Sequence, residues 1–253
     1  MTTLLIDAGN TFLKWACLVN GTVGASRSVV HHGVELREWQ DALAALTPAP
    51  TRVVAANVAG AAFALRLREF TRARWQLEPE FPAATRSALG VTNAYARPSA
   101  LGIDRWLAML AAWHVARAPL LCANAATAFT IDLIDAHGMH RGGCIVPGAR
   151  LMRESLHAQT SGVAAAAMLD PPAIDGAFGI NTAGAVQQGS RLALAALADR
   201  TALALEQAVA APARMFLTGG AGPQISALMT RPVEQVPDLV LRGLALTLAE
   251  AAT

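Results

Sequence analysis

Residues 4–21 read LLIDAGNTFLKWACLVNG, and their pattern predicts how the chain begins to fold. A short apolar run enters a polar turn at residues 7–11, and the alternation over residues 12–19 predicts the strand that returns from it. Asn20-Gly21 is a strong signal for the next tight turn, because both residue types tolerate the positive φ angles of a two-residue hairpin. With a third strand near residues 22–30, we expect an antiparallel meander at the start of the chain.

The rest of the first half alternates helix and strand. Helical spacing covers residues 34–46, and a β-type run at residues 52–58 leads into helical spacing at residues 61–75. Residues 76–100 are richer in Pro, Asn, Thr and Tyr and predict an ordered loop, after which residues 103–116 show a strong helical stripe. This order of elements, β-β-β-α-β-α, predicts a β-sheet lobe with helices.

The opening plan then repeats. Pro119 ends the preceding helix, residues 120–123 predict a strand, and Asn124-Ala125-Ala126-Thr127 predicts a second polar turn. A returning strand at residues 129–134 and another near residues 143–146 complete the repeat. Because the order of elements matches while the residues differ, we infer an internal structural duplication.

This duplication predicts an α/β fold with two RNase H-like lobes of the actin-like ATPase architecture and an active-site cleft between them. Helices at residues 148–159 and 181–209, a strand at residues 215–218 and helices to the C-terminus would complete the second lobe. The predicted lobes are residues 1–118 and residues 119–253.

Composition narrows the function classes. Hydrophobic residues make up 54% of the 253 residues and mean hydropathy is +0.38, but much of this is alanine. Polar and charged residues interrupt even the most apolar stretch, residues 107–131, so we do not expect a membrane protein. A net charge of +2 with scattered basic residues lacks the electrostatic footprint of a nucleic-acid binder.

The cysteines and the N-terminus indicate a reducing compartment. Cys17, Cys122 and Cys144 are odd in number, widely spaced and set in apolar sequence, a pattern of buried thiols rather than of disulfides or a zinc site. The chain starts with Met-Thr-Thr and enters an apolar run closed by Asp7, without a basic leader or a cleavage site. We therefore expect a cytoplasmic protein.

The first polar turn has the chemistry of a polyphosphate site. Gly9, Asn10 and Thr11 offer backbone N–H groups and side-chain donors, and nearby Lys14 adds a positive charge. Asp7 at the strand end suits a hydrated Mg²⁺, which prefers oxygen ligands and keeps several waters. The alternative is an Asx-type turn in which Asp7 caps backbone amides and Lys14 is merely exposed.

Two further segments could complete a nucleotide site. Thr127 can offer its hydroxyl and backbone N–H to the other end of a triphosphate, and Gly219-Gly220 leaves room for a flat ring such as adenine to lie against backbone. Taken alone, each segment is also compatible with an ordinary tight turn.

The segment Gly102-Ile103-Asp104-Arg105-Trp106 places a carboxylate and a guanidinium at the start of a helix. A kinase that phosphorylates an alcohol needs a carboxylate to accept the hydroxyl proton, and a positive group nearby can orient an acidic acceptor. The alternative is that Asp104 only complements the helix N-terminus while Arg105 is solvated.

Six segments in this order extend over nearly the whole chain. They are Asp7-Ala8-Gly9-Asn10-Thr11, Tyr95-x-x-Pro98-x-x-Leu101-Gly102-x-Asp104-Arg105, Thr127-Ala128-x-Thr130-x-Asp132, Gly142-Gly143-x-Ile145-x-Pro147-Gly148, Asn181-Thr182 and Thr218-Gly219-Gly220. The series resembles type III pantothenate kinase.

That resemblance implies phosphorylation of pantothenate to 4′-phosphopantothenate with ATP and Mg²⁺, the first step of coenzyme A biosynthesis, by a homodimer. It implies that Asp104 is the catalytic base and that Thr182 meets pantothenate from the neighbouring subunit. The implied ATP-binding residues are Asp7, Ala8, Gly9, Asn10, Thr11, Phe12, Leu13, Lys14, Thr127, Gly219 and Gly220; the implied substrate-binding residues are Tyr95, Gly102, Ile103, Asp104, Arg105 and Thr182.

One turn departs from that family. The family usually has Asp and Gly where this chain has Asn124 and Ala126, and the usual aspartate helps to bind an activating monovalent cation, potassium or ammonium. An amide keeps an acceptor oxygen but removes the charge. We therefore expect a weaker dependence on the cation at Asn124.

Two other functions stay open from the sequence. The chain could be another kinase or a phosphatase of the same superfamily, for example one that acts on a sugar. A sugar kinase would normally be longer and need several Asp, Asn or Glu side chains for vicinal hydroxyls, which residues 95–105 do not offer. A non-catalytic, kinase-like regulator could bind nucleotide and act through a partner. Retention of Asp7, Asp104 and Arg105 argues against the regulator.

Overall fold

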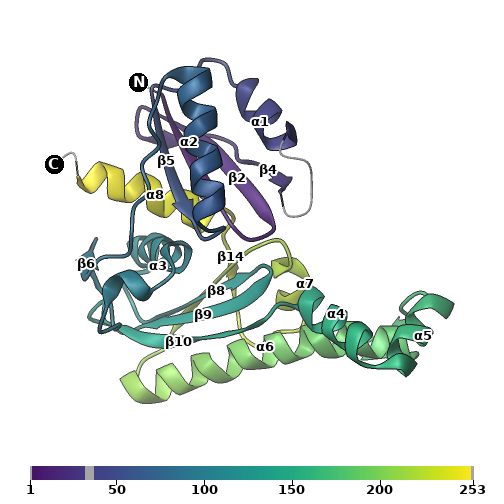
Figure 1. The fold of residues 1–253 in the computed structure, drawn as a ribbon. Helices are drawn as coiled ribbons and strands as arrows, with labels where there is room; N and C mark the ends of the chain where they lie inside the picture. Colours follow the sequence, from purple (N-terminus) through teal and green to yellow (C-terminus); the bar gives the residue numbers. More distant parts are fainter. Residues whose placement is uncertain (1, 32–36, 252–253) are drawn as a thin grey trace. The chain divides into compact units, whose positions relative to one another are not determined.

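The computed structural model describes residues 2–31 and 37–251, which divide into two compact units. The first unit holds the chain up to Val115 together with the last segment from Asp238, and the second unit is Ala116–Pro237. In Figure 1 the yellow helix α8, Leu239–Glu250, lies beside the purple strands of the first unit, although the two come from opposite ends of the chain.

The sheet of the first unit is built on one long hairpin. Strand β1 runs antiparallel to β2 and parallel to β5, while β3 and β4 both pair with β2. Beyond β5, Val54 forms a parallel bridge with Glu80. The strands are β1 (Thr2–Ala8), β2 (Phe12–Val19), β3 (Thr22–Val23), β4 (Arg27–Val30) and β5 (Arg52–Asn57).

The remaining elements of the first unit are α1 (Arg37–Ala44), α2 (Ala61–Trp75), β6 (Ser87–Ala88), β7 (Val91–Thr92), the 3₁₀ turn η1 (Pro98–Ala100), α3 (Ile103–Ala116) and α8. Apolar side chains of β1, β2, α1 and α2 form one core, which includes Ile6, Trp15, Trp39 and Phe63. The expected helix over residues 34–46 begins at Arg37 in the described chain; residues 34–36 lie outside it.

The sheet of the second unit has the order β10-β9-β8-β13-β14. Strands β8, β9 and β10 form an antiparallel meander, and β13 joins β8 in parallel, as β5 joins β1 in the first unit. This shared order confirms the inferred duplication. The strands are β8 (Leu120–Ala125), β9 (Ala128–Ile134), β10 (His140–Pro147), β13 (Arg214–Thr218) and β14 (Glu234–Gln235).

Helix α6 (Thr182–Val209) runs along this second sheet (Figure 1). It buries Leu194, Ala195, Ala198 and Ala202 in one core with the sheet. The other elements of the unit are α4 (Ala149–Gln159), α5 (Ser161–Leu169), the hairpin β11 (Ile174–Asp175) and β12 (Phe178–Gly179), and α7 (Gly222–Ser226).

Helix α8 differs from the expected domain division, which placed residues 119–253 in one lobe. The helix contacts β1, β2, β3 and β5 of the first unit and buries Leu241 and Leu244, and Gly243 lets it approach α3 closely. A Cβ atom on Gly243 would lie 2.2 Å from the Leu107 carbonyl oxygen. The last segment therefore belongs to the first unit, because its apolar face and its small residue fit there.

Three smaller features also bear on the sequence predictions. The second polar turn is shorter than expected, because Asn124 and Ala125 still belong to β8 and pair with Thr130 and Phe129. None of the three cysteines forms a disulfide; Cys122 is buried, whereas Cys17 and Cys144 are only partly buried. Among the residues with described positions, no helix is long and apolar enough to span a membrane.

Candidate active site

The first polar turn closes tightly between β1 and β2. Asp7 and Lys14 occupy opposed positions of the two strands, and Gly9 N–H donates to the Phe12 carbonyl oxygen at 3.1 Å. A Cβ on Gly9 would come within 3.3 Å of that oxygen. His31 N–H also donates to the Thr11 carbonyl oxygen at 2.9 Å. The turn therefore presents Asn10 and Thr11 from a fixed backbone.

The acid of this turn, Asp7, has a strongly raised pKa. Burial raises the pKa of its carboxyl group to about 7; Lys14 opposes the rise, and the carboxylates of Asp104 and Asp238 add to it. These four ionisable groups therefore share one electrostatic environment within the first unit. Coulomb coupling between such groups is strongest where they lie near one another and are poorly screened by water.

Asp238 is a member of this cluster that the sequence did not indicate. Its backbone is left-handed, with φ 59°, just before α8. One carboxylate oxygen accepts from Ser26 Oγ at 2.5 Å, and the other lies 4.0 Å from Lys14 Nζ. A Pro-Asp pair before a helix signals a cap, but no local pattern could place Asp238 beside Lys14, because the two residues stand at opposite ends of the chain.

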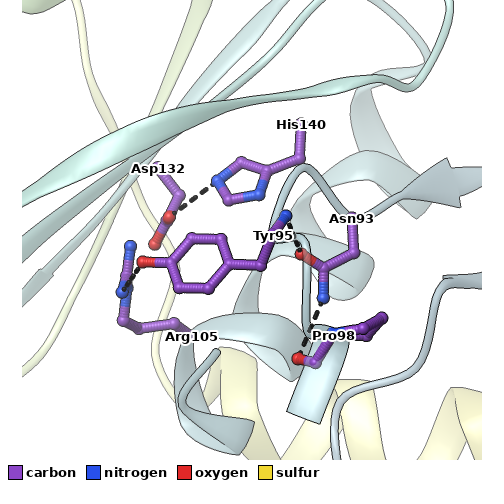
Figure 2. Close-up of polar contacts among 6 residues, drawn as sticks. All are labelled: Asn93, Tyr95, Pro98, Arg105, Asp132 and His140. Atoms are coloured by element: carbon purple, nitrogen blue, oxygen red, sulfur yellow. Dashed lines mark hydrogen bonds and ion pairs between the residues drawn. The ribbon is translucent and has the colours of Figure 1, made fainter. Parts of the chain in front are cut away.

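Asp104 and Arg105 lie in the first turn of α3, as expected. Arg105 is only 7% exposed; its Nη1 donates to Tyr95 Oη at 3.1 Å, and its guanidinium carbon lies 5.9 Å from the Tyr95 ring centre. Figure 2 shows this pair. The alternative in which Arg105 is solvated is therefore wrong.

Gly102 and Ile103 shape the start of the same helix. A Cβ on Gly102 would lie 2.7 Å from Asp104 Oδ1, so glycine leaves room for that carboxylate. Ile103 is buried, which anchors the helix start in the core. Tyr95, Gly102, Asp104 and the Asp7–Lys14 pair thus all belong to the first unit.

The second turn and the glycine pair meet in the second unit. Thr218 pairs with Asn124 across parallel strands β13 and β8. Gly219 follows with φ 95°, and a Cβ there would lie 2.4 Å from the Ala125 carbonyl oxygen and 2.6 Å from Asn124 Oδ1. Glycine is required at position 219 both by its backbone and by this close approach.

Thr127 stands at the tip of the same hairpin, partly exposed. Its carbonyl oxygen accepts from Gly148 N–H at 2.9 Å, and a Cβ on Gly148 would lie 2.2 Å from the Ala126 carbonyl oxygen. Gly220 is exposed beside Gly219. The structure thus brings Asn124, Thr127 and the Gly219-Gly220 pair to one end of the second sheet.

A buried polar pair lies on β9 and β10. His140 Nε2 and Asp132 Oδ1 are 3.0 Å apart, and both side chains are at most 3% exposed (Figure 2). Gly143 is fitted to the same place, since a Cβ would lie 1.9 Å from the Ile131 carbonyl oxygen. Packing therefore requires glycine at position 143, whereas at position 142 the backbone φ of 93° favours glycine.

Thr182 is exposed at the first position of α6, in the second unit. Asn181 caps the helix: its Oδ1 accepts from Gly184 N–H at 2.8 Å and from Ala173 N–H at 3.1 Å. The following residue, Ala183, lines an open hollow of about 320 Å³ together with residues that include Arg150, Arg153, His157 and Gln187.

The cluster around Asp7 fits a magnesium ion that keeps several waters. In the described part of the chain, no group of three or more His, Cys, Asp or Glu side chains could hold a metal by itself. Mg²⁺ in phosphoryl-transfer sites is bound by one or two carboxylates, waters and substrate phosphates rather than by a protein cage. A carboxyl group with raised pKa beside two other carboxylates would gain from such a cation.

Comparisons with known proteins agree over most of the chain or more. A family model described as type III pantothenate kinase matches residues 3–204. The type III pantothenate kinase of Aromatoleum aromaticum is 37% identical, over 98% of each chain, and that of Burkholderia mallei is 38% identical, over 96% of this chain and 97% of its own. A solved structure from Sinorhizobium meliloti, assigned as a 2-dehydro-3-deoxygalactonokinase, aligns with a TM-score of 0.58 at 17% identity, over 99% of this chain and 98% of its own; at that identity the likeness is one of fold.

Proposed function

This chain belongs to the type III pantothenate kinase family, and we propose how its residues share the work of that reaction. The activity is ATP-dependent phosphorylation of pantothenate to 4′-phosphopantothenate, the first step of coenzyme A biosynthesis. The observation that carries it is a match to the family over nearly all of both chains.

The first turn binds the triphosphate in this proposal. Backbone N–H groups and side chains of residues 9–11 approach the phosphate oxygens, and Lys14 supplies positive charge. Asp7, as carboxylate, would hold a hydrated Mg²⁺. Bound Mg²⁺ would neutralise charge on the phosphates during transfer.

Asp104 accepts the proton of the pantothenate hydroxyl. As the hydroxyl oxygen forms its bond to the γ-phosphorus, the bond to the β–γ bridging oxygen breaks, ADP leaves, and the proton passes to the Asp104 carboxylate. Arg105 and Tyr95 orient the acceptor, whose carboxylate complements a guanidinium. Gly102 and Ile103 form the adjoining wall of the pocket.

The second unit contributes the rest of the nucleotide site. Thr127 offers a hydroxyl and a backbone N–H to the phosphates, and Gly219-Gly220 lets adenine lie against backbone. At Asn124 a monovalent cation, potassium or ammonium, would find an amide oxygen without a negative charge, so we expect a weak site there.

We place the active enzyme in the cytoplasm as a homodimer that joins through the second unit. Phe178 and Ile180 are 71% and 70% exposed just before Thr182, and Ile174, Leu151 and Leu156 add apolar surface on the neighbouring hairpin and α4. Exposed apolar side chains in such a cluster favour a protein partner. A second copy would cover them and bring its Thr182 to the substrate.

A coupled assay of ADP release, with mass analysis of the product, tests the function directly. We expect ADP to form with pantothenate and 4′-phosphopantothenate to appear in equal amount. A hexose in place of pantothenate should give no release. Nucleotide binding without turnover on pantothenate would instead favour the non-catalytic regulator.

A further inference from the structure

The loop that carries Tyr95 is fixed by two side chains outside the matched motifs, and the first is Asn93. Asn93 is only 1% exposed. Its Nδ2 donates to the carbonyl oxygens of Thr85 and Pro98, each at 3.2 Å, and its Oδ1 accepts from Tyr95 N–H at 2.9 Å. Figure 2 shows Asn93 between Tyr95 and Pro98. One amide therefore links both ends of the loop to the backbone of Tyr95.

The second side chain is Arg86. Its Nη1 donates to the carbonyl oxygens of Asn93 at 3.1 Å and Tyr95 at 3.0 Å, and its Nη2 donates to that of Ala96 at 2.9 Å. Residues 93–97 belong to no helix or strand. The guanidinium thus donates hydrogen bonds to three backbone carbonyl groups. In a helix or strand, backbone N–H groups would satisfy such carbonyls instead.

Only a guanidinium suits this arrangement. Its N–H groups form a rigid planar fork, which can meet several carbonyls at once, whereas a lysine ammonium is a single mobile centre on a flexible stem. A lysine at position 86 would keep the charge and most of the length. It would lose the simultaneous hydrogen bonds to the carbonyl oxygens of Asn93, Tyr95 and Ala96.

We infer that Arg86 and Asn93 are positioning residues for the kinase reaction, which hold Tyr95 so that its hydroxyl meets Arg105 before the acceptor binds. The arrangement that they hold in place is the 3.1 Å hydrogen bond from Arg105 Nη1 to Tyr95 Oη. The inference rests on the proposed role of Tyr95 in pantothenate binding. A pocket ordered in advance lowers the entropy cost of binding, so loosening the loop should weaken pantothenate binding and leave ATP binding unchanged.

The first test is steady-state kinetics of Arg86→Lys, with Arg66→Lys as the matched control. Arg66 lies on α2 and donates within its own helix, to the Ala62 carbonyl oxygen, at 3.2 Å. We expect Arg86→Lys to raise KM for pantothenate about three- to tenfold, with KM for ATP and kcat within about twofold. The control should match the wild type, and an Arg86→Lys protein that also matches it would overturn the inference.

The second test uses the single tyrosine of the chain as a reporter. Protein labelled with ring-¹³C tyrosine gives a signal from Tyr95 alone. We expect Arg86→Lys, and equally Asn93→Asp, which keeps the Oδ1 acceptor but loses both Nδ2 donations, to shift or broaden that signal without pantothenate. An unchanged signal in both folded variants would contradict positioning, whatever the kinetics.

A double-mutant cycle separates this inference from the proposed substrate site. If Arg86 acts through Tyr95, Arg86→Lys should change KM for pantothenate less than about 1.5-fold in a Tyr95→Ala background. Full additivity would overturn the inference while leaving the proposed function intact. A Tyr95→Ala enzyme with unchanged KM for pantothenate would instead refute the substrate role of Tyr95, and the kinetic part of the inference with it.

Discussion

Asp7 and Lys14 face each other across the first hairpin, yet their attraction does not keep the Asp7 carboxyl acidic. Burial and the neighbouring carboxylates of Asp104 and Asp238 outweigh Lys14 and hold the pKa of Asp7 at about 7. The proposed magnesium site needs Asp7 in its ionised form. In the protein without a bound cation, this ionisation costs free energy. This is the expected electrostatic state of a site complementary to a cation that arrives with ATP.

Asp7→Asn should therefore stabilise the free protein while removing activity. Between about pH 4 and pH 7 the folded protein holds a proton on Asp7 that the unfolded chain has lost, so this group lowers the free energy of unfolding as pH rises through that window. At pH 8, without nucleotide or Mg²⁺, we expect the variant to be more stable by on the order of 1–3 kcal/mol.

Urea unfolding of wild type and variant at pH 4 and pH 8 measures this difference, and other titrating groups cancel in the comparison. At pH 4 the two proteins should be nearly equal in stability. A constant difference at both pH values would show that Asp7 titrates normally.

Gly243→Ala should destabilise the protein, because its Cβ would lie 2.2 Å from a backbone oxygen of α3 that cannot turn aside. Overpacking of this kind typically costs about 1–3 kcal/mol. Gly189→Ala is the matched control: it also lies in a helix, and its Cβ would meet nothing within 4 Å. Thermal unfolding should show a lower Tm for Gly243→Ala only; equal Tm values would mean that α8 and α3 separate easily.

The contrast between α3 and α8 shows what the sequence could predict. Strand β2 and helices α2 and α3 begin and end at the predicted residues, because Asn20-Gly21, Pro119 and regular apolar spacing are local signals. The return of α8 to the first unit is not local: it depends on Gly243 meeting Leu107. The same limit applies to the site, where the Asp7 and Asp104 motifs were visible but Asp238, Arg86 and Asn93 act through contacts that only the fold creates.

Turnover should depend only weakly on potassium, because Asn124 lacks the charge of the usual aspartate. Rates in sodium and potassium buffers of equal ionic strength should agree within about twofold, and Asn124→Asp should raise the ratio in favour of potassium. Asn124 Oδ1 lies close to Gly219 at the end of the second sheet, and an aspartate, which has nearly the same size, would restore the negative charge at that place. A strict potassium requirement in the wild type would mean that backbone oxygens form the site alone.

The homodimer should be visible by light scattering at micromolar concentration, and Thr182→Ala should raise KM for pantothenate more than KM for ATP. Thr182 is exposed, and so are Ile180 and Phe178 shortly before it in the sequence. Because Phe178 lies outside the core, Phe178→Asp should weaken the dimer without disturbing the core. If that variant is monomeric and still fully active, the pocket is not shared between subunits.

Asp104→Asn should cost mainly kcat. Asparagine keeps the size and the hydrogen bonding of the side chain but cannot accept a proton, and general-base assistance is worth about 10²–10⁴-fold in rate, or roughly 3–5 kcal/mol of barrier. If Asp104 only complemented the start of α3, Asn would serve almost as well there. ATP binding, measured by calorimetry, should persist because Asp104 is not assigned to the phosphates. A kcat within about threefold of wild type, in a variant shown to be folded by circular dichroism, corresponds to less than about 1 kcal/mol and would refute the assignment of Asp104 as base.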